Sequence, residues 1–150
     1  MLPSNKLVIE AAYASWAARD LDAVMASFAE DVTFIIHLPT DVVPYAGEVR
    51  GRAELLRRFK LLLNDFDFLS YQPVQIVDRA DSFHSLVRFH YRHVATGLEY
   101  EGTMRHTWKV EGDQIVRFEE FHDTERVRSF FRLLAQAQTV LQLRKDPMSE

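Results

Sequence analysis

The chain has 150 residues, a net charge of −4 and no cysteine. This length suits a single domain with a large apolar core, and the lack of cysteine excludes disulfides and thiolate chemistry. The acidic balance disfavours a nucleic-acid-binding surface. No apolar run is long enough to cross a membrane, and the first residues lack a signal-peptide pattern, so we expect a cytoplasmic protein.

The amino-terminal part of the sequence predicts three helices and one strand. Apolar residues at helical spacing indicate amphipathic helices over residues 5–19, 21–29 and 52–64. A short β-branched and aromatic run predicts a strand over residues 32–38. Prolines and glycines interrupt residues 39–51, which we expect to be irregular.

From residue 66 onward, the apolar pattern changes from helical spacing to alternation. Four strands are predicted, over residues 66–78, 83–95, 98–110 and 114–122, and a final helix over residues 124–143. Strands joined by short turns pair antiparallel. The sequence therefore predicts one α+β domain over the whole chain. It would consist of a curved antiparallel sheet covered by amino-terminal helices, a cavity between the two layers, and an extra C-terminal helix.

The last two predicted strands place one histidine and one carboxylate among apolar residues. Alternation over residues 98–110 puts His106 on the apolar face, and the run after the next turn puts Glu120 on a similar face. An ionisable group on such a face is costly unless it is paired or functional. The neighbouring Glu119 falls on the opposite face with Arg117, as expected of a solvated ion pair.

His106 and Glu120 share a face only under one condition. The turn between their strands must have an odd number of residues, or one strand must carry a bulge, because a one-residue slip inverts the alternation. With that condition the two side chains are cross-strand neighbours in a shared pocket. A histidine on an apolar face can also be an ordinary hydrogen-bonded core residue, and this alternative stays open.

Three segments stand in a recognisable order, namely residues 19–32, 44–52 and 112–123. In order and spacing they resemble the nuclear transport factor 2-like superfamily in its bacterial SnoaL-like branch, which is related to ketosteroid isomerase. The resemblance implies a conical sheet wrapped by helices, a pocket in the mouth of the cone, and a homodimer formed through the outer sheet face. The outward residues that would form this contact are Leu86, Arg88, His90, Thr103, Arg105 and Thr107.

The resemblance also implies site residues. Glu120 matches the acidic residue that SnoaL-like polyketide cyclases and limonene epoxide hydrolase use in the last strand, and His106 matches the histidine partner of the cyclases. His37 falls near the position of a water-binding amide in the epoxide hydrolases. Val87 and Phe89 stand where those hydrolases carry an arginine and an aspartate, so their mechanism is not expected here.

These residues indicate acid–base chemistry in an apolar pocket. Desolvation by large apolar neighbours would raise the pKa of Glu120, so its carboxyl could donate a proton to a carbonyl or accept one from an activated carbon. His106 and His37 could orient the substrate oxygen or exchange a second proton. The residues expected to bind the substrate are Tyr13, Trp16, His37, Tyr45, Met104, Trp108, Phe118 and His122.

No cofactor or metal is expected. The histidines lack the spacing of metal ligands, and the five glycines form no phosphate-binding loop. The sequence thus favours a cofactor-independent isomerase, cyclase or lyase that acts on a small hydrophobic carbonyl compound. Two alternatives stay open: a non-catalytic pocket that binds such a molecule, and a dimerisation module in which the cavity is a by-product of the fold.

Overall fold

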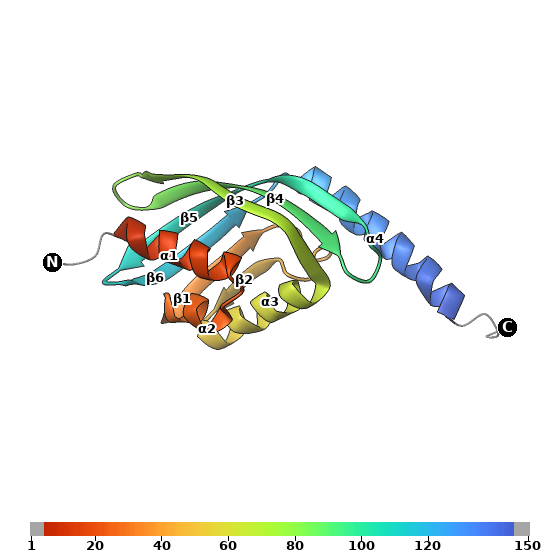
Figure 1. Ribbon diagram of the computed structural model, residues 1–150, viewed down its shortest axis with the longest axis horizontal. Helices are drawn as coiled ribbons and strands as arrows, with labels where there is room; N and C mark the ends of the chain where they lie inside the picture. Colours follow the sequence, from red (N-terminus) through yellow and green to blue (C-terminus); the bar gives the residue numbers. More distant parts are fainter. Residues whose placement is uncertain (1–4, 146–150) are drawn as a thin grey trace.

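The computed structural model describes residues 5–145, which form four helices and six strands (Figure 1). In chain order they are α1 (Asn5–Ala17), α2 (Leu21–Ala26), β1 (Phe28–His37), β2 (Gly47–Arg50), α3 (Arg52–Asp65), β3 (Phe66–Asp78), β4 (Phe83–His93), β5 (Glu99–Glu111), β6 (Gln114–Phe121) and α4 (Thr124–Lys145). Residues 1–4, on which part of the signal-peptide expectation rests, lie outside the described part of the chain.

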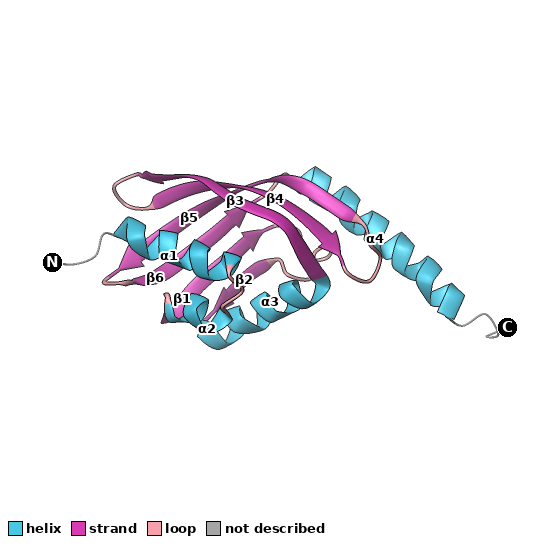
Figure 2. Ribbon diagram, in the orientation of Figure 1, coloured by secondary structure: helices cyan, strands magenta, loops and turns pink. Residues whose placement is uncertain are grey.

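The six strands form one sheet in the order β2-β1-β6-β5-β4-β3 (Figure 2). The predicted antiparallel pairing of β3, β4, β5 and β6 is confirmed. The sheet as a whole is mixed, because β1 runs parallel to β6. Only strands joined by a short turn must run antiparallel, and most of the chain separates β1 from β6. The two edges, β2 and β3, do not meet, so the curved sheet stays open.

Two boundaries near the amino terminus differ from expectation. The second helix ends before Phe28, which begins β1, whereas the sequence predicted a helix to residue 29. Here the amide of Ile115 donates to the carbonyl of Ser27 at 2.8 Å, so pairing with β6 begins as soon as the helix ends. The segment over residues 39–51 is not wholly irregular either, since its end forms β2 against β1.

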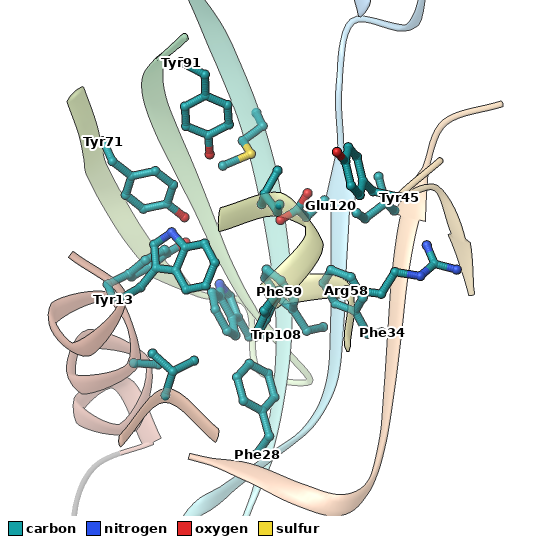
Figure 3. A pocket seen from close by; sticks show the side chains of 17 residues that line it. Tyr13, Phe28, Phe34, Tyr45, Arg58, Phe59, Tyr71, Tyr91, Trp108 and Glu120 are labelled. Atoms are coloured by element: carbon teal, nitrogen blue, oxygen red, sulfur yellow. The ribbon is translucent and has the colours of Figure 1, made fainter. Parts of the chain in front are cut away.

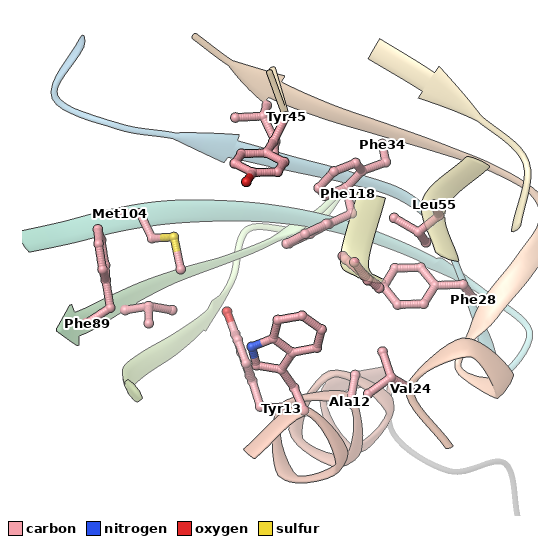
Figure 4. Close-up of a cluster of buried hydrophobic side chains, with 14 of the residues drawn as sticks. Ala12, Tyr13, Val24, Phe28, Phe34, Tyr45, Leu55, Phe89, Met104 and Phe118 are labelled. Carbon is pink, nitrogen blue, oxygen red and sulfur yellow. The ribbon is translucent and has the colours of Figure 1, made fainter. Parts of the chain in front are cut away.

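Helices α1, α2 and α3 cover one face of the sheet, and the apolar core lies between the two layers (Figures 1 and 4). In α3, Leu55 and Phe59 lie one turn apart and are both buried. The Phe59 ring packs against Trp16 of α1 and Phe34 of β1, with centroid separations of 4.9 Å and 5.7 Å. The buried side of α1 consists of Ile9, Ala12, Tyr13 and Trp16.

A β-bulge in β6 sets the face on which Glu120 lies. Lys109 is opposite Arg117, but the next residue of β5, Val110, is opposite Ile115. The residue between them on β6, at position 116, is therefore extra. This is the kind of irregularity that a shared face for His106 and Glu120 requires.

The opposite face of the sheet is polar and partly exposed. It carries the residues expected to form a dimer contact, which are Leu86, Arg88, His90, Thr103, Arg105 and Thr107. The homodimer itself stays a prediction. Within residues 5–145, no helix combines the length and the apolar character that crossing a bilayer requires.

Replacing Leu55 with alanine should lower the free energy of unfolding by about 2–5 kcal/mol, because the side chain is fully buried between α3 and the sheet. The matched control is Leu61→Ala on the same helix, where the leucine is 44% exposed and the loss should stay below about 1 kcal/mol. Urea unfolding followed by circular dichroism measures both values. Equal losses in the two variants would contradict this packing of α3.

Candidate active site

Glu120 lies between two histidines on the face of the sheet that the helices cover. It is the direct cross-strand partner of His106. Its Oε1 lies 3.4 Å from Nε2 of His106, and its Oε2 lies 3.2 Å from Nε2 of His122. The side chains are 15%, 1% and 11% exposed for Glu120, His106 and His122, so the carboxylate has little contact with solvent.

A buried chain of hydrogen bonds connects His106 to α1 and β4. Nδ1 of His106 lies 2.6 Å from the Tyr13 hydroxyl, which lies 2.5 Å from the Ser85 hydroxyl. The indole Nε1 of Trp108 donates to Ser85 at 2.9 Å. An indole N–H can only donate, whereas both hydroxyls can donate and accept. The position of the proton on His106 therefore decides which hydroxyl donates in each hydrogen bond.

The charge on Glu120 determines which group donates and which accepts in each of these hydrogen bonds. Burial alone would raise the pKa of Glu120, but contacts with His106 and His122 outweigh burial and lower this pKa to about 2. The expectation of a raised pKa is therefore wrong, and the group is a carboxylate at neutral pH. Burial lowers the pKa of His106 in spite of the nearby carboxylate, so the imidazole is neutral.

A neutral His106 presents an N–H group to the carboxylate only when its proton is on Nε2. Its Nδ1 then accepts from Tyr13, Tyr13 accepts from Ser85, and Ser85 accepts from Trp108. The opposite tautomer would direct a lone pair at the charge on Glu120. At 3.4 Å the contact from His106 to Glu120 is longer than an ordinary hydrogen bond, so its contribution is mainly electrostatic.

Glu120 faces an apolar pocket between the helices and the sheet (Figure 3). The pocket contains about 590 Å³ of empty space, its mouth included. Arg58 also lines it, but one guanidinium nitrogen already donates to the carbonyl of Ala46 at 2.8 Å. The remaining walls are largely aromatic and aliphatic, and include Trp16, Phe28, Phe34, Phe59, Met104 and Phe118. Such a lining suits a hydrophobic ligand.

Two tyrosines bring hydroxyl groups into this pocket. Tyr71 of β3 and Tyr91 of β4 direct their hydroxyls into the cavity that Glu120 faces (Figure 3). Neither hydroxyl forms a hydrogen bond with another of the described residues. Burial raises the pKa of both phenols well above the ordinary value, so both stay protonated and can donate to an oxygen atom of a ligand.

Most of the residues expected to bind the substrate line this pocket, and these are Tyr13, Trp16, Tyr45, Met104, Trp108 and Phe118. The hydroxyl of Tyr45 donates to the carboxylate of Asp65, so it is already engaged. His122 contacts Glu120 and lines an adjoining pocket. Within residues 5–145, no group of three or more His, Asp or Glu side chains is arranged to hold a metal ion.

His37 lies on the opposite face of the sheet, so the expectation that it joins the pocket is wrong. In β1 the buried residues Phe34 and Ile36 face the helices, and strand alternation therefore turns His37 outward. Its Nε2 lies 2.8 Å from Oε1 of Glu119. Its ring also stacks on Phe121, with a centroid separation of 4.4 Å.

Three polar residues of the site, namely Ser85, Tyr71 and Tyr91, are not predicted from the sequence. Ser85 and Tyr91 follow the inward alternation of β4, so this signal could have identified them. Tyr71 could not be found in this way. Leu69 is an extra residue in β3, and this bulge brings both Phe68 and Tyr71 to the inner face.

The fold is that of a class of proteins in which a curved sheet and amino-terminal helices enclose an apolar pocket. The chain belongs to the SnoaL-like domain family, whose model matches residues 9–118. This confirms the resemblance that the sequence motifs indicated. A comparison with curated proteins found no match.

Solved structures share the fold. An NTF2-like protein from Burkholderia thailandensis has a TM-score of 0.74 and 25% identity, over 91% of this chain and 98% of that chain. TerC, co-crystallised with polyporic acid, has a TM-score of 0.68 and 20% identity, over 85% and 98% of the two chains. A protein from Catenulispora acidiphila with a ketosteroid isomerase-like fold, in complex with trimethylamine, has a TM-score of 0.68 and 13% identity, over 85% and 91%.

Lowering the pH should destabilise the fold through His106 and Glu120. Both groups have a lowered pKa in the folded state, so the unfolded chain binds more protons. The stabilisation from His106 is complete above pH 6.5 and is lost as the pH falls below that value. The stabilisation from Glu120 is complete above pH 4.5 and is lost as the pH falls toward about 2.

Urea unfolding measured from neutral pH down to about pH 3 tests this expectation. The free energy of unfolding should fall by a few kcal/mol in the wild-type protein. In Glu120→Gln the part of this decline that lies below pH 4.5 should be smaller. An identical decline in both proteins would show that Glu120 is not held as a carboxylate.

Proposed function

We propose that this protein is a cofactor-independent enzyme of the isomerase or cyclase type, which moves a proton on a small hydrophobic carbonyl compound. The observation that carries the proposal is the ionised carboxylate of Glu120, which faces an apolar pocket and is held between two imidazoles. A charge in such surroundings is costly, and a carboxylate at the wall of a ligand pocket is well placed to act as a general base.

In the proposed step, Glu120 takes a proton from the carbon next to the substrate carbonyl. The electrons of the broken C–H bond form an enolate, whose oxygen accepts a hydrogen bond from Tyr71 or Tyr91. If the substrate has a C=C bond next to that carbon, this bond is conjugated with the enolate, and the protonated Glu120 returns the proton to the far carbon of the C=C bond, which gives a double-bond isomer. Alternatively, the enolate carbon attacks a second carbonyl of the same molecule and Glu120 protonates the new alkoxide, which closes a ring. Neither route needs a co-reactant.

A carboxylate with a pKa of about 2 is a weak base in the empty pocket. A substrate that fills the pocket removes water from around Glu120, and desolvation raises the proton affinity of a carboxylate. His106 holds the carboxylate toward the substrate, and Tyr13 fixes the tautomer of His106 through Nδ1. Tyr13 and Ser85 are thus positioning residues, which act through the imidazole.

Related structures support the small-molecule part of this proposal. TerC was co-crystallised with polyporic acid, and the Catenulispora acidiphila protein was solved in complex with trimethylamine. The fold therefore presents a binding site for small molecules in other chains. In this chain, the predominantly apolar lining and the few polar groups around Glu120 favour a hydrophobic carbonyl compound.

Glu120→Gln should slow the exchange of the methylene protons of phenylacetone in D2O by about 10²–10⁴-fold relative to the wild-type protein, because an amide cannot accept the proton. The matched control is Glu119→Gln, which changes the adjacent carboxylate on the opposite face and should leave the rate unchanged. Loss of the methylene signal in proton NMR spectra measures exchange, and ligand-observed NMR measures binding.

Wild-type exchange in Glu120→Gln would overturn the proposal. Binding of the ketone without any exchange in the wild-type protein would also contradict it, and would favour a binding protein of the same fold.

Tyr13→Phe should lower kcat for this exchange more than it changes KM. The variant keeps the ring that stacks on His106 at 5.8 Å but removes the donor to Nδ1. The neutral imidazole then loses stabilisation, so the pKa of His106 should rise and the acidic limb of the pH–rate profile should move to higher pH. NMR titration of His106 provides an independent readout. Ser85→Ala should shift the acidic limb by less. An unchanged acidic limb in Tyr13→Phe would contradict the positioning role of the hydrogen bonds from Ser85 and Tyr13 to His106.

A further inference from the structure

A second apolar pocket adjoins the first and shares Glu120 with it. It lies between the sheet and α4 and contains about 510 Å³ of empty space, its mouth included. Its walls include Leu38, Phe66, Phe89, Val127, Phe130 and Phe131. The last three belong to α4, which begins after the region that the family model matches, so one wall comes from outside that region.

Four residues line both pockets, and these are Ile36, Tyr45, Tyr91 and Glu120. The Tyr45 hydroxyl is engaged with Asp65, so the carboxylate of Glu120 and the hydroxyl of Tyr91 are the polar groups of this boundary that can meet a ligand. Beyond the boundary, the walls on both sides are mostly apolar. The groups able to act on a carbonyl therefore lie where the two pockets meet.

A third polar group borders the same place from the side of the second pocket. His122 lines that pocket and contacts Glu120 through Nε2, while its Nδ1 is buried without a hydrogen-bond partner among residues 5–145. Buried polar atoms are seldom left without a partner.

We propose that the substrate is an elongated ketone whose reacting carbon lies in the middle of the molecule, with an apolar, ring-sized group at each end. One end lies in the first pocket beside Trp16 and Phe59, and the other lies in the second pocket beside Phe66 and Phe130. The position of the reacting carbon rests on the proposed function of Glu120, whereas binding across two pockets does not depend on catalysis.

Three ketones that differ in their number of phenyl groups test this proposal: dibenzyl ketone has two, phenylacetone has one and acetone has none. Isothermal titration should show that the wild-type protein binds dibenzyl ketone at least about tenfold more tightly than phenylacetone, because a second phenyl group leaves water. Acetone should bind most weakly. The order should persist in Glu120→Gln, since it comes from the apolar walls.

Two matched substitutions assign the two ends of the ligand. Leu38→Phe fills the second pocket, and Leu62→Phe fills the first. Each substitution should weaken the binding of dibenzyl ketone by about tenfold, to the affinity of phenylacetone for the wild-type protein. The binding of phenylacetone itself should be weakened by at most one of the two substitutions. Leu61→Phe places the same change at a leucine that is 44% exposed and should alter neither affinity.

Unchanged affinity for dibenzyl ketone in Leu38→Phe would overturn the proposal, because the second pocket would then be unused. If that variant does not fold, Phe131→Ala replaces it, and loss of this wall should weaken the binding of dibenzyl ketone. Equal affinities for the two ketones together with rapid exchange would refute two-pocket binding alone. The expected affinities without exchange would refute the proposed catalysis alone.

Discussion

The site depends on how an ionised carboxylate is kept on the apolar face of a sheet. Burial opposes the charge on Glu120, and two imidazoles offset this cost. His106 can do so only as the neutral tautomer that carries its proton on Nε2, because its own burial lowers its pKa. Tyr13 accepts a hydrogen bond from Ser85 and donates one to Nδ1, which selects that tautomer. The packing of α1 on the sheet therefore also controls the electrostatics of the site.

One extra residue in β6 determines which of two adjacent glutamates takes this role. Glu119 lies on the outer face, where it contacts His37 at 2.8 Å and Arg117 at 3.2 Å. Glu120 lies on the inner face, between two imidazoles and an apolar pocket. Without the bulge at position 116, the alternation would exchange the two faces. The chemistry of the site thus depends on a local irregularity of the backbone as much as on the type of side chain.

The sequence was sufficient for the strands of the second half and for placing His106 and Glu120 each among apolar residues, because strand alternation is a local property. Their shared face also requires the bulge in β6, which alternation alone does not predict. The parallel pairing of β1 with β6 depends on contacts between distant segments, and no local pattern encodes it. The position of Tyr71 was not predicted, because the bulge at Leu69 interrupts the alternation from which the face of this residue would be predicted. The pKa of Glu120 was expected to rise because desolvation by its apolar neighbours was given more weight than a neighbouring imidazole. The lowering comes from imidazoles that the fold brings together.

The packing of α4 suggests how ligand choice and chemistry are separated in this fold. The first half of α4 packs on the body of the protein, through Val127, Phe130, Phe131 and Leu134, while Val140 and Leu143 of its second half are 48% and 67% exposed. Three of these four packed residues, Val127, Phe130 and Phe131, also line the second pocket. None of them contacts the hydrogen-bond chain that ends at His106. Substitutions in this half of α4 would therefore alter the space for one end of a ligand and leave the hydrogen bonds that link Trp108, Ser85, Tyr13 and His106 unchanged.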